Sequence, residues 1–132
     1  MILDSSAIVA ILFDEAEAAP FAHAIRRADA VAVAAPTLVE SAMVAEGRAM
    51  PGMADKLDAL LGAIRPEIVA FTAEHARIAC DGWRRFGKGR HPAGLNFGDC
   101  MVYAVAMVEG APLLFTGEDF ARTDVAVAGG GG

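Results

Sequence analysis

The chain has 132 residues, of which 55% are hydrophobic and 21% charged, a composition that suits one domain with a substantial core. It excludes intrinsic disorder, and the presence of only Cys80 and Cys100 excludes a disulfide scaffold. The formal net charge of −6, taken alone, argues against a protein that holds nucleic acid on a basic surface. No apolar run approaches the roughly 18 residues of a membrane span. Because Asp4 also interrupts the apolar N-terminal residues, we expect a cytoplasmic protein without membrane contact.

Short apolar runs alternate with amphipathic helical patterns along the chain. The runs predict strands at Ile2–Leu3, Ala30–Ala34, Ile68–Phe71 and Leu113–Phe115, and Val125–Val127 is a candidate edge strand. Helical patterns follow Asp4, Pro20, Thr37, Gly52, Thr72 and Asn96. This alternation predicts a single α/β domain over residues 1–128, with a mostly parallel central sheet of four or five strands flanked by helices (α/β/α). Residues 129–132 are expected to form a flexible glycine tail.

Four carboxylates are expected at one edge of this sheet. Asp4 and Asp119 follow predicted strands, whereas Glu40 and Asp99 lie in the first turns of helices that come after strands. Ligands of open parallel sheets gather at the carboxyl ends of the strands. Each acid alone suits a helix cap or the helix dipole, but four acids that converge repel one another unless a cation neutralises them. Oxygen ligands without His or Cys favour Mg²⁺ or Mn²⁺, which indicates metal-assisted hydrolysis of a phosphodiester.

Four stretches of the sequence carry information beyond the acids themselves. They are Met1–Ala7, Pro36–Glu40, Leu95–Cys100 and Leu113–Phe120. In order and spacing they resemble the PIN-domain family, and more narrowly the VapC ribonuclease toxins of bacterial toxin–antitoxin pairs. The resemblance implies a PIN-like fold and an Mg²⁺- or Mn²⁺-dependent endoribonuclease that cuts tRNA or rRNA and is inhibited by a VapB-like antitoxin. The alanine-rich helices also suggest a homodimer.

The resemblance assigns roles to the acids by position. Asp4, Glu40, Asp99 and Asp119 match the catalytic quartet of the family, and Asp4, Asp99 and Asp119 are the expected metal ligands. Glu118 either supplements Asp119 or faces solvent, and we favour Asp119. A metal-activated water that attacks phosphorus predicts products with 5′-phosphate and 3′-hydroxyl ends.

Three polar residues are expected to support the quartet. Ser6 matches the hydroxyl residue that hydrogen-bonds around Asp4, and Thr116 is expected to act similarly at the far end of the chain. Asn96 introduces the helix that carries Asp99.

The segment from Trp83 to His91 is basic and is punctuated by glycine. Its candidate RNA contacts are Arg85, Lys88 and Arg90. Clustered cations follow a phosphate backbone and aromatic rings stack on bases, but the same pattern is typical of a solvated helix end. Trp83 itself is expected in the core.

Two other functions remain open from the sequence. They are a PIN-domain nuclease that processes RNA without an antitoxin, and a catalytically silent PIN-like interaction domain. A haloacid-dehalogenase-like phosphatase is disfavoured because Ser6 stands where that chemistry needs a second Asp. A receiver-like domain is disfavoured because Thr72, not Asp, follows the third predicted strand.

Overall fold

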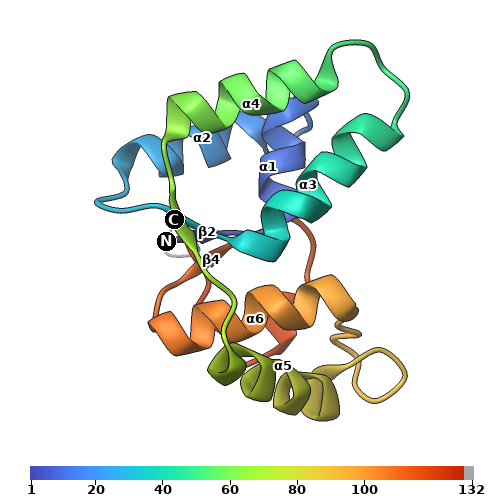
Figure 1. Ribbon diagram of the computed structural model, residues 1–132. Helices are drawn as coiled ribbons and strands as arrows, with labels where there is room; N and C mark the ends of the chain where they lie inside the picture. Colours follow the sequence, from blue (N-terminus) through green and yellow to red (C-terminus); the bar gives the residue numbers. More distant parts are fainter. Residues whose placement is uncertain (130–132) are drawn as a thin grey trace.

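Four short parallel strands cross the middle of the molecule in the order β3-β2-β1-β4 (Figure 1). They are β1 (Ile2–Leu3), β2 (Ala32–Ala34), β3 (Glu67–Val69) and β4 (Leu113–Leu114). This computed structural model describes residues 1–129. Ile2 pairs with Ala32 on one side and Leu113 on the other, so β1 lies inside the sheet and is buried. The candidate fifth strand at Val125–Val127 is reduced to a single bridge between Val127 and Leu113.

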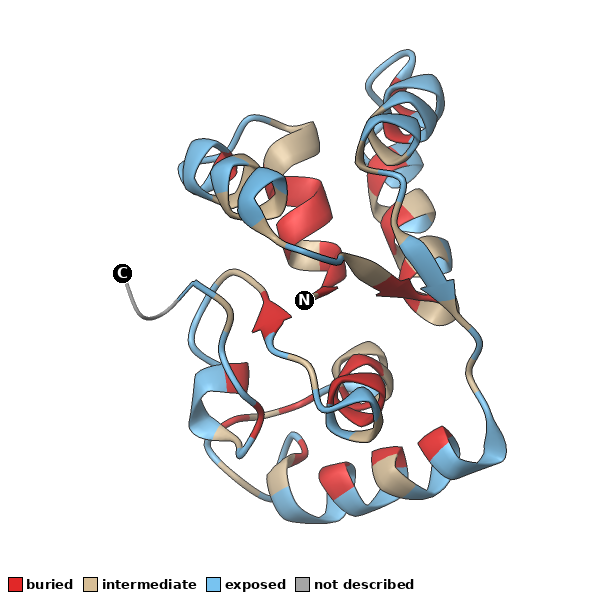
Figure 2. Ribbon diagram, turned by 90° about the vertical axis from the view of Figure 1, so that its left-hand side faces the viewer, coloured by how far each residue is buried: buried red, intermediate tan, exposed pale blue. Residues whose placement is uncertain are grey.

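Helices cover both faces of the sheet. They are α1 (Ser5–Leu12), α2 (Ala18–Arg27), α3 (Ala35–Gly47), α4 (Met53–Ile64), α5 (Ala73–Phe86) and α6 (Phe97–Glu109), followed by a 3₁₀ helix at Phe120–Arg122. The first four helices lie on one side, whereas α6 lies against the other side and α5 packs outside it (Figure 2). The predicted α/β fold with a parallel central sheet is therefore confirmed. Among residues 1–129, no helix is long and apolar enough to cross a membrane.

Local sequence signals set most helix starts. The Asp4 side chain caps α1, and Asn96 caps α6 through a capping box. The predicted start of α3 is wrong, because this helix begins at Ala35 directly after β2 and Thr37 lies inside it. Pro36 suits the first turn, where its missing N–H would have no helical partner. Of the predicted glycine tail, only Gly129 lies within the described residues.

The tightest packing in the core joins α5 to α6. Tyr103 is the largest fully buried side chain, and its hydroxyl donates a hydrogen bond to Asp124 Oδ1 at 2.7 Å. Its ring lies so close to Gly82 that a Cβ atom there would be 2.6 Å from Tyr103 Cδ1. The two helices therefore approach each other only because residue 82 has no side chain.

Replacing Gly82 by alanine tests this packing. We expect G82A to lower the free energy of unfolding by about 1 to 3 kcal/mol, because the added methyl group overpacks a rigid contact. The matched control is G62A on α4, where a Cβ meets no atom within 4 Å. That change should raise stability by about 0.5 to 1 kcal/mol through helix propensity. Urea unfolding of both variants provides the measurement, and equal effects of the two changes would contradict the packing described.

Candidate active site

Asp4 lies at the carboxyl end of β1 and is the most deeply buried acid of the predicted quartet. Its backbone N–H donates to Leu114 O at 3.0 Å, which fixes the end of β1 beside β4. Asp4 Oδ2 accepts hydrogen bonds from Ser6 N at 3.0 Å and from Ser6 Oγ at 2.6 Å. Ser6 Oγ in turn accepts the Thr116 N–H at 3.0 Å. A chain of hydrogen bonds thus joins the loop after β4 to the Asp4 carboxylate. Thr116 contributes its backbone N–H to this chain.

The environment of Asp4 disfavours its charged form. Burial raises the pKa of the Asp4 carboxyl above its usual value, and the charge of Glu40 adds to this effect. The two hydrogen bonds from Ser6 oppose it without reversing it. A buried carboxylate of this kind is stabilised by a nearby cation.

Glu40 reaches the same site from α3. Because α3 begins earlier than predicted, Glu40 lies in the second turn of the helix and not in the first. Ser5 Oγ donates a hydrogen bond to Glu40 Oε1. The other oxygen, Oε2, lies against Gly98 at the start of α6, where any side chain would collide with it. Ser5 therefore holds this carboxylate, and the lack of a side chain at Gly98 makes room for it.

Asp99 lies in the first turn of α6 and is half-buried. Its Oδ2 accepts the Asn96 N–H at 3.1 Å, while its own N–H donates to Asn96 Oδ1 at 2.9 Å. Burial raises the pKa of Asp99 from 3.8 to about 6, and the charges of Asp4, Glu40 and Asp119 contribute to the rise. The charges of all three other acids of the quartet therefore act on the Asp99 carboxyl group.

Asp119 is the most exposed member of the quartet and directly precedes the 3₁₀ helix. Its neighbour Glu118 instead forms an ion pair with Arg122 Nη2 at 3.1 Å on the surface. Asp119 contributes to the raised pKa of Asp99, and Glu118 is not among the principal causes. This arrangement favours Asp119 over Glu118 as the fourth acid.

The four acids thus approach one another at the carboxyl edge of the sheet, from segments far apart in the sequence. Within residues 1–129, no three His, Cys, Asp or Glu side chains stand close enough to hold a metal ion in their present conformations. The donor set nevertheless fits a hard divalent cation, because it consists of carboxylate oxygens whose charged forms are disfavoured by burial and mutual repulsion. A cation bound there would require the side chains of the acids to rotate toward one another.

The basic segment lies next to this site, at the end of α5 and in the loop that leads to α6. Arg85 binds Asp124 at 3.1 Å and Asp81 at 3.4 Å, so two acids compensate its charge. Arg90 Nε donates to Arg84 O at 3.1 Å and its guanidinium group lies over an aromatic ring. Among residues 1–129, the side chain of Lys88 forms no hydrogen bond or ion pair, and only its backbone N–H is engaged, with Leu95 O at 3.0 Å. Its ammonium group is therefore left for another molecule.

Two residues that matter in the structure, Ser5 and Gly98, were not singled out from the sequence, and a third, Trp83, was misplaced. Ser5 positions Glu40, and the only signal was its place beside Ser6 after the first acid. Gly98 makes room for Glu40, which its place beside Asp99 did not reveal. The prediction that Trp83 belongs to the core is wrong, since its side chain is 45% exposed.

A family model of the PIN domain matches residues 1–126 of the chain. Among curated proteins, the ribonuclease VapC30 of Mycobacterium tuberculosis is 41% identical over 126 residues, which cover 96% of both chains. The ribonuclease VapC of Mycolicibacterium smegmatis is 44% identical over 96% of this chain and 98% of the relative. The chain therefore belongs to the PIN-domain family, and within it to the VapC ribonucleases.

Solved structures show the same fold at lower sequence identity. VapBC2 from Rickettsia felis, bound to a DNA fragment from its promoter, matches with a TM-score of 0.74 and 18% identity, over 96% of this chain and 94% of that chain. VapC20 from Mycobacterium tuberculosis, a toxin that cleaves the sarcin–ricin loop, matches with a TM-score of 0.71 and 19% identity, over 96% and 98%. At these identities the likeness concerns the fold alone.

The raised pKa of Asp99 makes a prediction about stability. Since the folded state holds the proton more tightly than the unfolded state, stability falls as the pH rises from about 4 through the folded-state pKa of about 6. In a chelator, D99N should therefore be more stable than the wild type by about 1 kcal/mol near pH 7, after allowance for solvent screening. The gain should shrink as the pH falls and vanish below about pH 3, where the carboxyl group is protonated in both states.

Thermal unfolding at both pH values provides the measurement. The matched control is D58N, which changes an exposed acid on α4 outside the site. A loss of stability in D99N near pH 7 would contradict the repulsion described among the acids.

Proposed function

We propose that this chain is an Mg²⁺- or Mn²⁺-dependent endoribonuclease and the toxin of a VapBC-type toxin–antitoxin pair. The observation that carries the proposal is the approach of Asp4, Glu40, Asp99 and Asp119 at the carboxyl edge of the sheet, where burial and mutual charge raise the pKa of Asp4 and Asp99. The relatives at 41% and 44% identity, which are named ribonucleases, support the same activity.

The acids have different roles in this proposal. Asp4, Asp99 and Asp119 would hold the cation through their carboxylate oxygens. When bound, Mg²⁺ or Mn²⁺ supplies positive charge against the phosphodiester and increases the acidity of a water molecule. Glu40 would orient a water molecule through Oε2, because Ser5 already donates a hydrogen bond to Oε1.

The Ser6 hydroxyl and the Thr116 backbone keep Asp4 in place. Ser6 binds Asp4 and is itself held by the backbone of Thr116, so the first acid cannot swing away from β1. Such prearrangement reduces the reorganisation needed when the substrate arrives.

The histidines support attack by water rather than by the ribose 2′-hydroxyl. His23 lies on α2, His75 caps the start of α5, and the His91 ring accepts the Ala93 N–H. None belongs to the acidic group, whereas attack by a 2′-hydroxyl commonly uses a pair of histidines as acid and base. The products should therefore carry 5′-phosphate and 3′-hydroxyl ends.

We also propose an antitoxin as the partner of this chain. Similar solved structures include the VapBC complexes of Rickettsia felis and Mycobacterium tuberculosis. A largely apolar groove of about 920 Å³ lies between α3 and α6, beside Glu40. Exposed Val39, Met43 and Phe97 line this groove, which suits an apolar segment of the antitoxin. The expected homodimer stays a prediction.

RNA cleavage by the purified chain tests the activity directly. The wild type should cut RNA in Mg²⁺ or Mn²⁺, lose activity in EDTA, and regain it when either cation is restored. D4N should lower the rate of cleavage by a factor of about 10³ or more, because it removes the central negative charge of the site. E118Q is the matched control and should cut nearly as fast as the wild type.

Expression in bacteria completes this test. The wild type should stop growth and leave discrete RNA ends with 5′-phosphates, which selective sequencing detects, and D4N should do neither. A 2′,3′-cyclic phosphate product, or equal toxicity of the two proteins, would contradict the proposed function. Cleavage without growth arrest would favour a nuclease of RNA processing over a toxin.

A further inference from the structure

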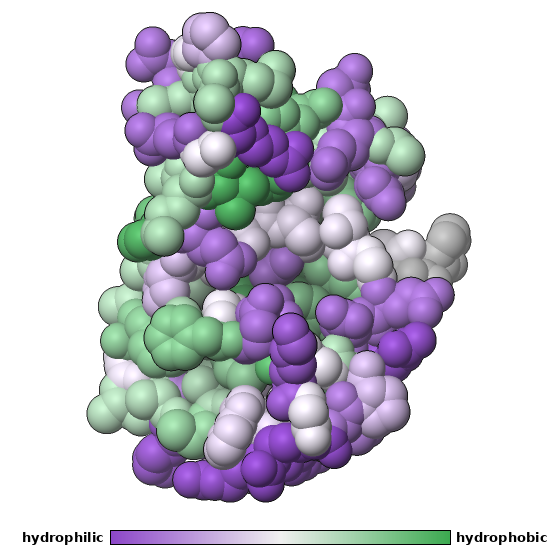
Figure 3. Space-filling view, turned by 90° about the vertical axis from the view of Figure 1, so that its right-hand side faces the viewer, coloured by the Kyte–Doolittle hydropathy of each residue, from purple (hydrophilic) through white to green (hydrophobic). Residues whose placement is uncertain are grey.

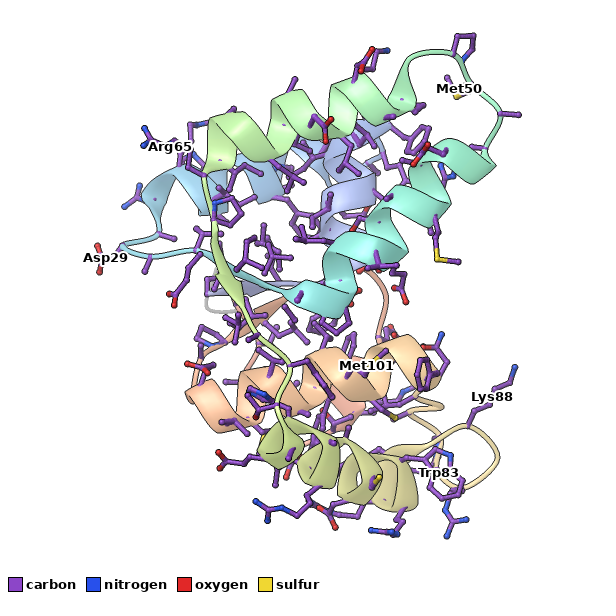
Figure 4. The ribbon with its side chains drawn as sticks, in the orientation of Figure 1. Asp29, Met50, Arg65, Trp83, Lys88 and Met101 are labelled. Carbon is purple, nitrogen blue, oxygen red and sulfur yellow. The ribbon has the colours of Figure 1, made fainter. Side chains whose placement is uncertain are left out.

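A second pocket lies beside the acidic site, between the end of α5 and the start of α6. It has a volume of about 380 Å³, within the range of sites for small ligands, and its walls are mostly apolar. Trp83, Lys88, Asn96 and Phe97 belong to its lining. Trp83 and Lys88 lie at the same end of the pair formed by α5 and α6 (Figure 4). Since Asn96 also binds Asp99, the pocket shares a wall with the acidic site.

The Trp83 ring is fixed in place although it is exposed. The Arg90 guanidinium lies 4.6 Å from the centre of the ring and does not line the pocket, so it covers ring surface other than the part that the pocket exposes. The edge of the ring lies against Gly87, where a Cβ atom would be 3.0 Å from Trp83 Nε1. Trp83 therefore presents a rigid aromatic surface to the pocket.

Phe97 supplies a second aromatic ring at the mouth of the pocket. Its side chain is 82% exposed, although it lies two residues before Asp99. An apolar ring so exposed next to an acidic site gains little from the fold itself. Figure 3 shows the corresponding face of the molecule, on which hydrophobic side chains gather along one side and border hydrophilic ones.

The segment beside the pocket is rich in cations in an otherwise acidic chain. The segment 84–90 contains four cationic residues and no acid, whereas the whole chain carries a net charge of −6. Lys88 lines the pocket itself, and within residues 1–129 it has no ionic partner. A polyanion with flat apolar rings complements this surface better than an apolar peptide does.

We propose that this pocket binds an unstacked base of the RNA substrate, next to the phosphodiester that is cut. The base stacks on Trp83 and Phe97, and Lys88 binds an adjacent phosphate. This inference rests on the proposed ribonuclease function and extends it by naming residues that select single-stranded RNA. Paired bases cannot enter the pocket, so the preference is for loops and single strands.

Fluorescence tests the pocket without requiring cleavage, because Trp83 is the only tryptophan of the chain. In the D4N protein, a short single-stranded RNA of mixed sequence should quench Trp83 emission as it binds. Polyphosphate of similar charge has no bases and should leave the emission unchanged. F97A should weaken RNA binding about tenfold, in line with the loss of one stacked base.

Lysine variants provide a matched comparison, since the chain has only Lys56 and Lys88. In the D4N protein, K88A should weaken RNA binding several-fold and make the salt dependence of binding shallower, because one phosphate contact is lost. K56A changes an exposed residue on α4 and should bind RNA as the parent does. Equal affinities of the two variants would overturn the role of Lys88.

Cleavage by otherwise wild-type protein separates this inference from the proposed function. W83A should raise KM about tenfold with a smaller change in kcat, and W83F should restore most of the loss, with circular dichroism as the check on folding.

If the wild type cuts RNA but RNA leaves Trp83 emission unchanged, the proposed base pocket is wrong and the proposed ribonuclease function stands. If RNA quenches Trp83 but the wild type cuts nothing, the proposed function is wrong. A response to an amphipathic peptide and not to RNA would assign the pocket to a protein partner and overturn the inference.

Discussion

A buried negative charge at the end of β1 is the constraint around which this molecule is arranged. Asp4 follows a strand that is hydrogen-bonded on both sides, so the carboxylate is held deep at the sheet edge and cannot move to solvent. Ser6 donates two hydrogen bonds to it, and Thr116 supports Ser6 from the loop after β4. These bonds only partly offset the burial that raises the pKa of Asp4. A cation bound as proposed would offset the remaining cost.

The other three acids add to the electrostatic repulsion around Asp4, and the four acids together account for part of the net negative charge of the chain. Glu40 and Asp99 come from helices on opposite sides of the sheet, and the collective charge contributes to the raised pKa of Asp99. Four of the 17 acidic residues belong to this site, while four cations gather in the segment 84–90 next to it. The net charge of −6 therefore does not argue against a nucleic-acid substrate. It reflects in part a site that suits a divalent cation beside a surface that suits a phosphate backbone.

The parts of this arrangement that depend on local sequence were predictable, and those that depend on packing were not. Asp4 and Asp99 were placed correctly because an acid after a buried strand, or in the first turn of a capped helix, has its position fixed by a few neighbouring residues. The turn that carries Glu40 was misplaced because α3 continues from β2 without a loop. Gly98 matters only through its contact with α3, and Trp83 is exposed because Tyr103 and its neighbours already fill the space between α5 and α6. Such long-range contacts leave no periodic signal in one sequence.

Anomalous scattering from Mn²⁺ in crystals of the metal-soaked protein tests the central claim most directly, because it locates the cation independently of any activity. We expect a strong peak in contact with the carboxylates of Asp4 and Asp99, with Asp119 turned toward it, and we expect the peak to be absent in crystals of D99N. A saturating soak that leaves this position empty, or a peak found only at other surface acids, would contradict the account of these four residues as a metal site.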